Sequence, residues 1–316
     1  MPRLPTPRGH PGAPMASQTE TAAGDSPLIS VITVCRNAAA TLEACLDSVA
    51  QQSWPRIEHI VIDGASTDGT AAILERHRDR LAHVVSEPDG GLYDAMNKGV
   101  ALARGDFVFF LNADDTFASR DSLRDAMRQI ARDPQGDVYY GSLEVRGPGG
   151  TVVHVPPPPE RAEEEMVLGC LPHQAALARR AVFARTGPFD LRWRRHADYD
   201  WWLKVMADPS LRLRRIDAVV GSFALGGASS DLAKGQPEVF AIQNASPVYR
   251  SAEWDRRRIE LFQKAWLEAR MALAAREEGG PAPGRPNWKG RLITNLPGPL
   301  RRLALGVRSW MRGARG

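Results

Sequence analysis

The sequence predicts an α/β fold, with a mostly parallel sheet flanked by helices and a helical extension at the C-terminal end. Between residues 28 and 115, apolar runs of strand length alternate with segments that carry apolar residues at helical spacing. Such alternation is typical of right-handed strand–helix–strand units that build a parallel sheet. Polar loops follow three of the apolar runs, and the content of 43% hydrophobic and 25% charged residues is that of a globular protein.

The elements of this first half follow one another without long gaps. The predicted strands are 28–34, 57–62, 82–86 and 107–111, and the predicted helices are 38–51, 70–80 and 93–103. The first strand is a β-branched run, as expected for a central strand of a parallel sheet that is buried on both faces.

The strand Phe107-Val-Phe-Phe-Leu111 ends abruptly in Asn112-Ala-Asp-Asp115. In open α/β sheets, ligands collect outside the carboxyl ends of the strands, where polar groups need not be buried. Carboxylates at such a position suit a hard divalent cation, Mg²⁺ or Mn²⁺, whose other ligands are waters and substrate phosphates. The alternative, that these acids only cap the next helix, stays open on the triplet alone.

Two more strand ends carry polar residues, Arg36 and Asn37 after the first strand and Asp63 to Asp68 after the second. No Gly-x-Gly-x-x-Gly sequence follows the first strand, and a Walker A loop is absent. A bound nucleotide would therefore have to be held by side chains and a metal ion.

After residue 115 the pattern is looser. Strands are predicted at 137–145 and 151–155, joined by a Gly-Pro-Gly-Gly turn and followed by a stiff run of four prolines. A helix after residue 194 brings Asp198 near one face with Trp202 and Val205, where the acid is either a functional group or a helix cap.

The C-terminal part predicts an amphipathic helix over 251–276. Its apolar side is expected to carry Ile259, Phe262, Trp266 and Leu273.

Charge separates the last residues from the rest. Residues 281–316 contain eight Lys or Arg and no acid, which leaves 33 basic and 37 acidic side chains in residues 1–280, a net charge of −4. We therefore expect no nucleic-acid binding by the main body, and attraction of the tail to an anionic membrane surface through an interfacial helix over 299–312. The alternatives for this tail are a helix packed on the protein or a disordered segment.

Other features of the sequence concern the membrane, the cellular compartment and the N-terminal segment. No apolar run reaches the roughly 18 to 20 residues of a membrane span. Three cysteines without metal-type spacing indicate a reducing cytoplasm. The first 27 residues are predicted to be disordered, and either Met1 or Met15 is the expected start.

Five motifs in order resemble family 2 glycosyltransferases of the GT-A fold, with a Rossmann-like sheet, nearest the colanic-acid-type branch of bacterial polysaccharide enzymes. They are Ser30-Val-Ile-Thr-Val-Cys-Arg-Asn37, Ile62-Asp-Gly-Ala-Ser-Thr-Asp-Gly-Thr70, Gly91-Leu-Tyr-Asp-Ala-Met-Asn-Lys-Gly99, Leu111-Asn-Ala-Asp-Asp115 and His196-Ala-Asp-Tyr-Asp200. The resemblance covers residues 28 to about 230.

The resemblance implies a site for a nucleoside diphosphate sugar. Its residues would be Thr33, Arg36, Asn37, Asp63, Ser66, Asp94, Lys98, Asn112, Ala113 and Asp114. Within this set Asp63 would bind the base, with Thr33, Arg36 and Asn37 lining the same pocket, and Asp114 would bind the divalent cation. The role of Asp94 is open, and Lys98 is either a cation near the diphosphate or a solvated helix lysine.

The resemblance also implies that Asp198 takes the proton from the acceptor hydroxyl as it attacks the anomeric carbon, with inversion of configuration. His173 and Gln174 match a His-Gln pair of this branch and are assigned to the acceptor side. The acceptor would be a glycan or a lipid-linked sugar, in cell-surface polysaccharide biosynthesis at the inner face of the membrane.

Three positions depart from the family pattern. Asn112 replaces the first acid of the usual Asp-x-Asp, Ala197 replaces a common Glu, and Met96 stands where many relatives have Arg. The Gln-x-x-Arg-Trp motif of processive synthases is missing, so one sugar per encounter is expected. The alternatives are a nucleotidyltransferase, which would need a Gly-rich loop and a phosphate-binding Lys near the first strand, and an inactive membrane-associated binding module.

These considerations divide the chain into five segments. They are a disordered N-terminal segment (1–27), a nucleotide-binding half (28–115), an acceptor-binding half (116–250), an amphipathic helix (251–280) and a basic tail (281–316).

Overall fold

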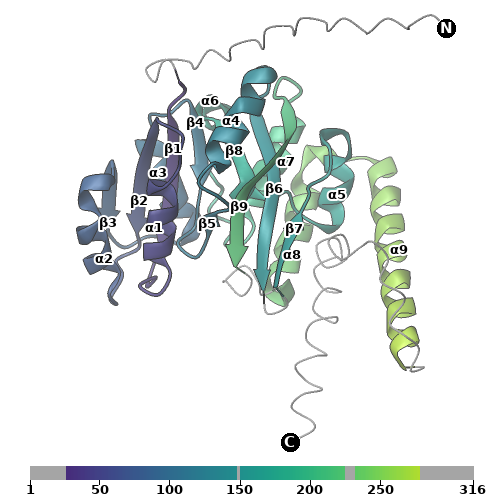
Figure 1. Ribbon diagram of the computed structural model, residues 1–316. Coiled ribbons are helices and arrows are strands. Elements are labelled where there is room, and N and C mark those ends of the chain that lie inside the picture. The colour runs from purple at the N-terminus through teal and green to yellow at the C-terminus, as the bar shows by residue number, and fades with distance from the viewer. Residues whose placement is uncertain (1–25, 148–149, 225–231, 278–316) are drawn as a thin grey trace, which may run out of the picture.

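The computed structural model describes residues 26–147, 150–224 and 232–277, and its strands join in one sheet (Figure 1). The strand order is β3-β2-β1-β4-β8-β6-β9-β5, with β7 paired to β6. The predicted α/β fold is confirmed. The predicted tail over 281–316, most of the predicted N-terminal segment 1–27 and two of the turn residues, 148 and 149, lie outside the described residues.

The first four strands are parallel, as predicted. They are β1 (Ile29–Cys35), β2 (Ile57–Asp63), β3 (His83–Ser86) and β4 (Phe107–Phe110). In their register Asp63 lies beside Cys35 on one side and Ser86 on the other, and Ile32 lies beside Phe110. The loops that leave these strands therefore start from the same edge of the sheet.

The second half makes the sheet mixed. Its strands are β5 (Thr116–Phe117), β6 (Val138–Gly147), β7 (Gly150–His154), β8 (Ala176–Arg179) and β9 (Leu213–Ala224). β8 is antiparallel to both β4 and β6, whereas β9 is parallel to β6. The predicted parallel pairing is thus present where strands and helices alternate regularly along the chain. The strands that follow this part pair in both directions.

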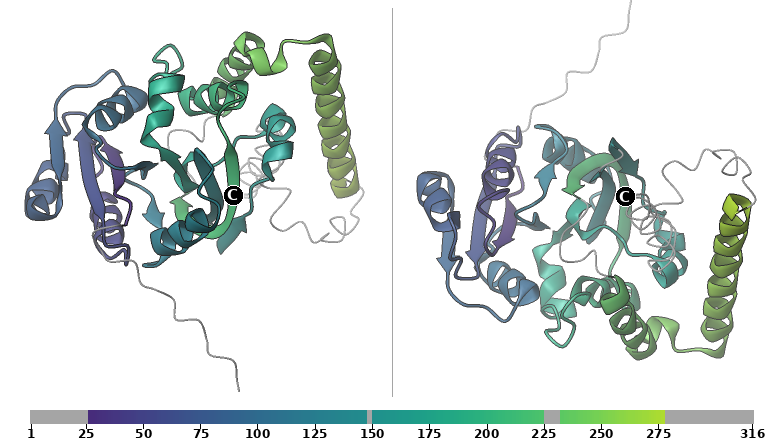
Figure 2. Two further views of the ribbon diagram at one scale, coloured as in Figure 1. Left: turned by 90° about the horizontal axis from the view of Figure 1, so that it is seen from above. Right: turned by 90° about the horizontal axis from the view of Figure 1, so that it is seen from below.

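Helices cover both faces of the sheet (Figures 1 and 2). The helices are α1 (Leu42–Ala50), α2 (Thr70–Arg76), α3 (Leu92–Leu102), α4 (Ser122–Arg132), α5 (Ala162–Leu168), α6 (Arg180–Thr186), α7 (Ala197–Ala207), α8 (Leu232–Ala245) and α9 (Ala252–Glu277). Buried residues of α3, α6 and α7 pack with Ile32 and Val34 of β1, whereas those of α1 and α4 pack with Ile29 and Val31. Alternate residues of one strand thus enter two different cores, which explains why every residue of β1 is buried.

Two helices differ from their predicted form. α1 begins at Leu42 rather than at residue 38, because residues 38–41 form a turn in which the Thr41 amide donates to the Ala38 carbonyl. α9 is present as predicted, but Ile259 and Trp266 are 57% and 61% exposed, so the expected apolar stripe is wrong at these positions. The neighbouring stripe through Phe262 and the buried Ala265 faces the body instead.

Three further features of the described residues concern membrane spans, cysteines and the ends of the molecule. Within the described residues no helix is both long enough and apolar enough to cross a membrane. The thiols of Cys35, Cys45 and Cys170 are free. α9 and α2 lie at opposite ends of the molecule (Figures 1 and 2).

Candidate active site

The loops after β1 and β2 are tied together at the sheet edge. Asn37 has a positive φ of 52°, a conformation in which asparagine is tolerated better than most residues. Its backbone N–H donates to Ser66 Oγ at 2.7 Å, and its side-chain Oδ1 accepts from the Thr67 N–H at 2.9 Å. Asn37 and Ser66 therefore lie side by side, while Arg36 next to Asn37 is exposed, and the predicted nucleotide pocket stays a prediction.

Asp63 organises this corner. It is fully buried, and its carboxylate accepts hydrogen bonds from the Ser66 N–H and hydroxyl and, at 2.6 Å, from the Ser86 hydroxyl. These bonds join β2, its loop and the end of β3. The carboxylate is largely engaged by the protein, and its predicted contact with a nucleotide base stays a prediction.

Thr33 does not line the cleft, which corrects its predicted place in the nucleotide pocket. It has no exposed surface, and its hydroxyl lies 2.9 Å from Nε2 of the buried His59. The physical reason is the strand period, because Thr33 points into the core that also holds Cys45. Burial, and to a lesser extent the charge of His77, lower the pKa of His59 to about 3.

Asp89, which was not among the predicted site residues, lies close to the predicted residue Arg36. A Cβ at Gly64 would overlap the Asp89 carboxylate and would lie close to the Arg36 side chain, so these groups share the space above the β2 loop. Glycine at position 64 permits this approach. The available signal was an acid directly before Gly90-Gly91, at the end of the third strand.

Asp94 and Lys98 stabilise the loop before α3. Asp94 accepts from the Gly90 N–H at 2.9 Å, and Lys98 Nζ lies 2.7 Å from Glu87 and 3.5 Å from Asp94. The hydrogen bond with Glu87 is the main reason why the pKa of Lys98 is raised. Both residues lie on the β3–α3 connection, and their predicted contact with the donor sugar stays a prediction.

The acids after β4 lie at the edge of the sheet where a metal site is predicted, and that metal site stays a prediction. Asp114 is half-buried, and its backbone carbonyl accepts from Arg146 of β6 at 3.4 Å. Ala113 is buried beneath this edge. Asn112 donates to Asp115 Oδ2 at 3.4 Å, and the Oδ1 of Asn112 is buried without a hydrogen-bond partner.

Asp115 is almost completely buried behind Asp114, with 1% of its surface exposed. Burial and the neighbouring Asp114 carboxylate raise the pKa of Asp115 to about 7, and the charge of His173 acts in the opposite direction. The two adjacent acids therefore differ in chemistry, with Asp114 the more accessible of the pair.

The residues at this edge fit a divalent cation whose coordination is completed by waters and by a bound substrate. The described residues contain no group of three His, Cys, Asp or Glu side chains that would hold an ion alone. Mg²⁺ characteristically uses one or two carboxylates together with waters and substrate phosphates. The Asp114 carboxylate and the unpartnered amide oxygen of Asn112 are ligand types of that kind.

On the other side of the site, Asp198 lies in the first turn of α7 with 8% of its surface exposed. The Tyr93 hydroxyl of α3 lies 2.5 Å from its Oδ1, and Nδ1 of His173 lies 3.0 Å from its Oδ2. Burial alone would raise the pKa of Asp198. The hydrogen bonds from His173 and Tyr93 outweigh it and lower the pKa to about 2.

His173 connects the two sides. It lies in the short helix η3 (His173–Ala175), bonded to Asp198, and its charge influences Asp115. Gln174 follows it, and its carbonyl packs so closely against Gly221 of β9 that a Cβ there would overlap it. The His173 ring is thus hydrogen-bonded to Asp198 and close enough to Asp115 for its charge to act on that acid.

Glu238 of α8 holds the approach to α7 in place. Its carboxylate accepts from the Arg194 and Arg195 N–H groups, the latter at 2.9 Å, and lies 3.2 Å from Nδ1 of His196. This position was not predicted, because nothing in its local sequence links it to residues more than 40 positions earlier.

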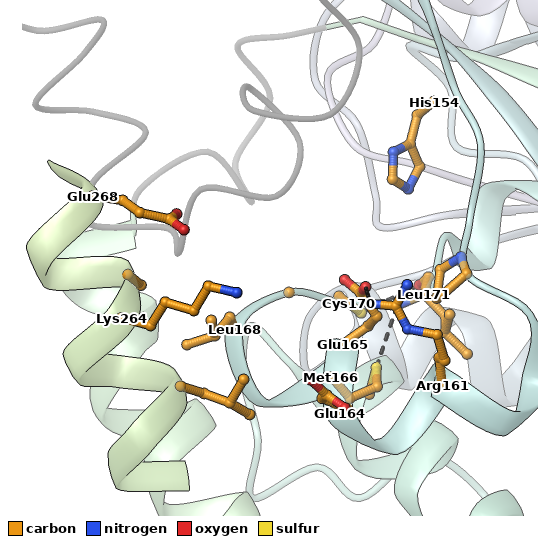
Figure 3. A pocket seen from close by; sticks show the side chains of 14 residues that line it. His154, Arg161, Glu164, Glu165, Met166, Leu168, Cys170, Leu171, Lys264 and Glu268 are labelled. Carbon is orange, nitrogen blue, oxygen red and sulfur yellow. Dashed lines mark hydrogen bonds and ion pairs between the residues drawn. The ribbon is translucent and has the colours of Figure 1, made fainter. Parts of the chain in front are cut away.

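A cavity of about 200 Å³ lies near the acceptor side, between α5 and α9 (Figure 3). Lys264 and Glu268 of α9 point toward it from one side, and Arg161, Glu165 and Cys170 line the other. Asp114 and Asp198 do not line this cavity. Cys170, which lines this cavity, lies three residues before His173 in the chain.

Comparison with known proteins identifies the family. The family model described as "Glycosyl transferase family 2" matches residues 30–186. A PGL/p-HBAD biosynthesis glycosyltransferase from Mycobacterium bovis is 34% identical over 215 residues, which are 66% of this chain and 81% of the relative. The chain belongs to glycosyltransferase family 2. An uncharacterised glycosyltransferase from Mycobacterium tuberculosis is 35% identical over 181 residues, covering 57% of this chain and 69% of that protein.

Solved structures share the fold of this family 2 glycosyltransferase. A mannosyltransferase from Pyrobaculum calidifontis, in complex with GDP-Man and Mn²⁺, has a TM-score of 0.59 and 23% identity, covering 91% of this chain and 84% of that chain. Staphylococcus aureus TarS, in complex with UDP-GlcNAc, has a TM-score of 0.58 and 21% identity, covering 74% and 71%. The predicted GT-A fold and enzyme class are thereby confirmed, whereas the colanic-acid-type branch stays a prediction.

Proposed function

We propose that this glycosyltransferase is an inverting, metal-dependent enzyme that moves one sugar from a nucleoside diphosphate sugar to an acceptor hydroxyl. The observation that carries the proposal is that His173 is hydrogen-bonded to Asp198 while its charge acts on Asp115, the neighbour of Asp114. Sugar transfer by displacement needs a group that neutralises the leaving diphosphate on one side and a base on the other. The relatives with UDP-GlcNAc and GDP-Man support a nucleotide sugar as donor.

On the donor side, Asp114 would hold Mg²⁺ or Mn²⁺, with Asn112 as a further oxygen ligand. A bound cation of this kind neutralises the negative charge that builds on the diphosphate as the sugar departs. Arg146 fixes the backbone of Asp114 and adds a positive charge beside it. The mannosyltransferase with Mn²⁺ supports the choice of metal.

On the acceptor side, Asp198 would take the proton from the acceptor hydroxyl. One displacement at the anomeric carbon, with no covalent enzyme intermediate, inverts the configuration of the sugar. The cavity between α5 and α9 offers charged groups of both signs near this side, which suits a further polar part of a glycan or lipid-linked acceptor.

The reaction is placed at the cytoplasmic face of the inner membrane, in the biosynthesis of a cell-surface glycan. The relative named for PGL/p-HBAD biosynthesis supports a cell-envelope product of this general kind. Membrane contact is assigned to the basic tail 281–316. Equal flotation with anionic liposomes of the full chain and of a chain ending at Gly280 would exclude that contact.

A donor screen tests the proposal. Nucleoside diphosphate sugars are ranked by thermal shift with and without Mn²⁺, because a ligand that binds the folded state stabilises it by mass action. The best donor is then offered to hydroxyl acceptors, and NMR of the product gives the anomeric configuration. We expect metal-dependent transfer with inversion, lost in Asp114→Asn and retained in Asp125→Asn of the exposed face of α4.

Four outcomes contradict the proposal. A product with retained configuration would contradict the single-displacement mechanism. Full activity in the presence of a chelator would contradict the dependence on a metal ion. Transfer of a nucleotidyl group instead of a sugar, or donor binding without any turnover, favours the nucleotidyltransferase or the inactive binding module.

A further inference from the structure

The carboxylate of Glu238 in α8 contacts three consecutive residues that lead into α7. One oxygen accepts from the Arg194 N–H, and the other accepts from the Arg195 N–H at 2.9 Å and lies 3.2 Å from Nδ1 of His196. Only 16% of the Glu238 side chain is exposed. Hydrogen bonds to an ionised carboxylate are about twice as strong as those between neutral groups. Glu238 therefore fixes the backbone of residues 194–196.

The start of α7 has no side-chain cap of its own. His196 is the N-cap residue, and its side chain makes no capping hydrogen bond. A helix start is usually fixed by a Ser, Thr, Asn or Asp at this position. In this protein α8 packs on the helix start instead. Gly235 lies so close to the His196 imidazole that a Cβ at position 235 would overlap Cε1. Gly235 and Glu238, about one helical turn apart, thus place α8 on the same residue.

The segment fixed by α8 leads directly to Asp198, the acid that would take the acceptor proton. Asp198 lies two residues after His196, in the first turn of α7. A second helix contacts the same segment, because the Tyr93 hydroxyl of α3 lies 2.9 Å from the Arg195 carbonyl and 2.5 Å from Asp198 Oδ1. Arg195 is therefore bonded to α8 through its N–H and to α3 through its carbonyl.

We propose that Glu238 is a positioning residue of sugar transfer, which fixes residues 194–196 and thereby places the Asp198 carboxylate within reach of the acceptor hydroxyl. The inference rests on the proposed function, in which Asp198 takes the proton of that hydroxyl. A base must come within about 2.6 to 3.2 Å of the oxygen that it deprotonates, and a displacement of about 1 Å can cost about 100-fold in rate. Glu238 acts through the backbone before α7 and not on the reacting atoms.

Glu238→Gln is the decisive variant. The amide keeps the size of the side chain and one acceptor oxygen, but its NH₂ group replaces the other oxygen and faces a backbone N–H that needs an acceptor. We expect kcat to fall by about 10- to 100-fold, with the donor KM and the thermal shift by the donor within twofold of the wild type. The donor values stay because the bonded segment belongs to the acceptor side. Glu260→Gln, on an α9 side chain that is 66% exposed, is the matched control and should keep kcat within twofold.

A double-mutant cycle with Tyr93→Phe tests whether the two helices act on the same segment. Variants within one hydrogen-bond network have effects on free energy that are not additive, whereas the effects of distant, independent sites add. We expect the double variant to lose at least about threefold less kcat than the product of the two single losses. A loss equal to that product would mean that Glu238 acts independently of the segment that Tyr93 contacts, and would overturn the inference.

Gly235→Ala is a second variant that leaves the Glu238 carboxylate in place. The added Cβ would push α8 away from the His196 imidazole, so kcat should again fall while the donor KM stays. This result would support the inference even if Glu238→Gln did not fold. If Gly235→Ala keeps kcat within twofold, the packing of α8 does not position Asp198 and the inference is overturned.

Failure of the proposed function and failure of this inference are distinguishable. If the wild-type enzyme transfers no sugar, the proposed function fails, and this inference fails with it. If the wild type transfers sugar and Glu238→Gln keeps kcat within twofold, only this inference is overturned. The same holds if the donor KM of Glu238→Gln rises as much as its kcat falls, because Glu238 would then act on the whole site and not on Asp198.

Discussion

The Tyr93 hydroxyl lies 2.5 Å from Oδ1 of Asp198, although 105 residues separate them. The same hydroxyl lies 2.9 Å from the Arg195 carbonyl, so it contacts both the acid and the segment that leads to it. Tyr93 belongs to α3, next to the donor-side loops, and Asp198 to α7 on the acceptor side. The contact is a rigid link between the two halves of the site.

Tyr93→Phe should lower kcat by about tenfold and leave donor binding unchanged. The variant keeps the ring in its core and removes one hydrogen bond to a charged group, a contribution of about 1.5 to 3 kcal/mol. Since that bond helps to lower the pKa of Asp198, its loss raises the pKa of the acid. Kinetics under donor saturation, together with thermal shift, provide the measurement, and an unchanged kcat would mean that Tyr93 only packs the core.

Three residues show how much of the candidate site could be predicted from the sequence. Asp114 was predictable, because it follows a buried strand in an α/β pattern. Thr33 was not, because its strand is buried on both faces and apolar periodicity does not show which polar residue reaches the edge. The pairing of His173 with Asp198 depends on how η3 and α7 meet in space. Local spacing carries no information on that meeting.

The same limit applies to α9 and to Asp89. The helix was evident from its length and composition, but tertiary packing chose the stripe through Ala265 rather than that through Trp266. Asp89 lies just before the motif that begins at Gly91, and its position beside Arg36 depends on the way that Gly64 opens the space between two loops.

Asp114→Ala should abolish the stabilisation that Mn²⁺ adds to donor binding and reduce kcat by at least about 10²-fold, since removing one group that stabilises transition-state charge costs that much. Thermal shift with the nucleoside diphosphate, titrated with Mn²⁺, provides the measurement. Asp125→Ala is the control on α4. An unchanged Mn²⁺ titration would place the cation elsewhere.

Arg146→Met should weaken activation by Mn²⁺ by about five- to tenfold. The guanidinium donates to the carbonyls of Asp114 and Ser222, at 3.4 Å and 3.2 Å, and so connects the metal-binding edge to β9. The measurement is the Mn²⁺ concentration that gives half-maximal rate. Arg128→Met removes an exposed arginine of α4 as the control, and equal values for both variants would show that Arg146 has no part in the metal edge.

The buried His59 should make the fold lose stability as the pH falls. Its pKa is about 3 in the folded protein, lowered by burial, whereas the unfolded chain titrates near the ordinary value of 6.5. Above pH 6.5 both states are neutral at this residue and stability is complete. As the pH falls from 6.5 toward 3, the unfolded state binds the proton and the folded state does not, so the free energy of unfolding decreases by up to about 5 kcal/mol.

Urea unfolding at pH 8, 6 and 5 measures this effect in two matched variants. His59→Gln keeps a polar group opposite the Thr33 hydroxyl but cannot titrate, so its stability should change less between pH 6.5 and 5 than that of the wild type. Thr33→Val removes the hydroxyl partner and keeps the histidine, so it should lose about 1 kcal/mol at every pH while retaining the full slope. If the free energy of unfolding of His59→Gln depended on pH as strongly as that of the wild type, groups other than His59 would cause the acid sensitivity.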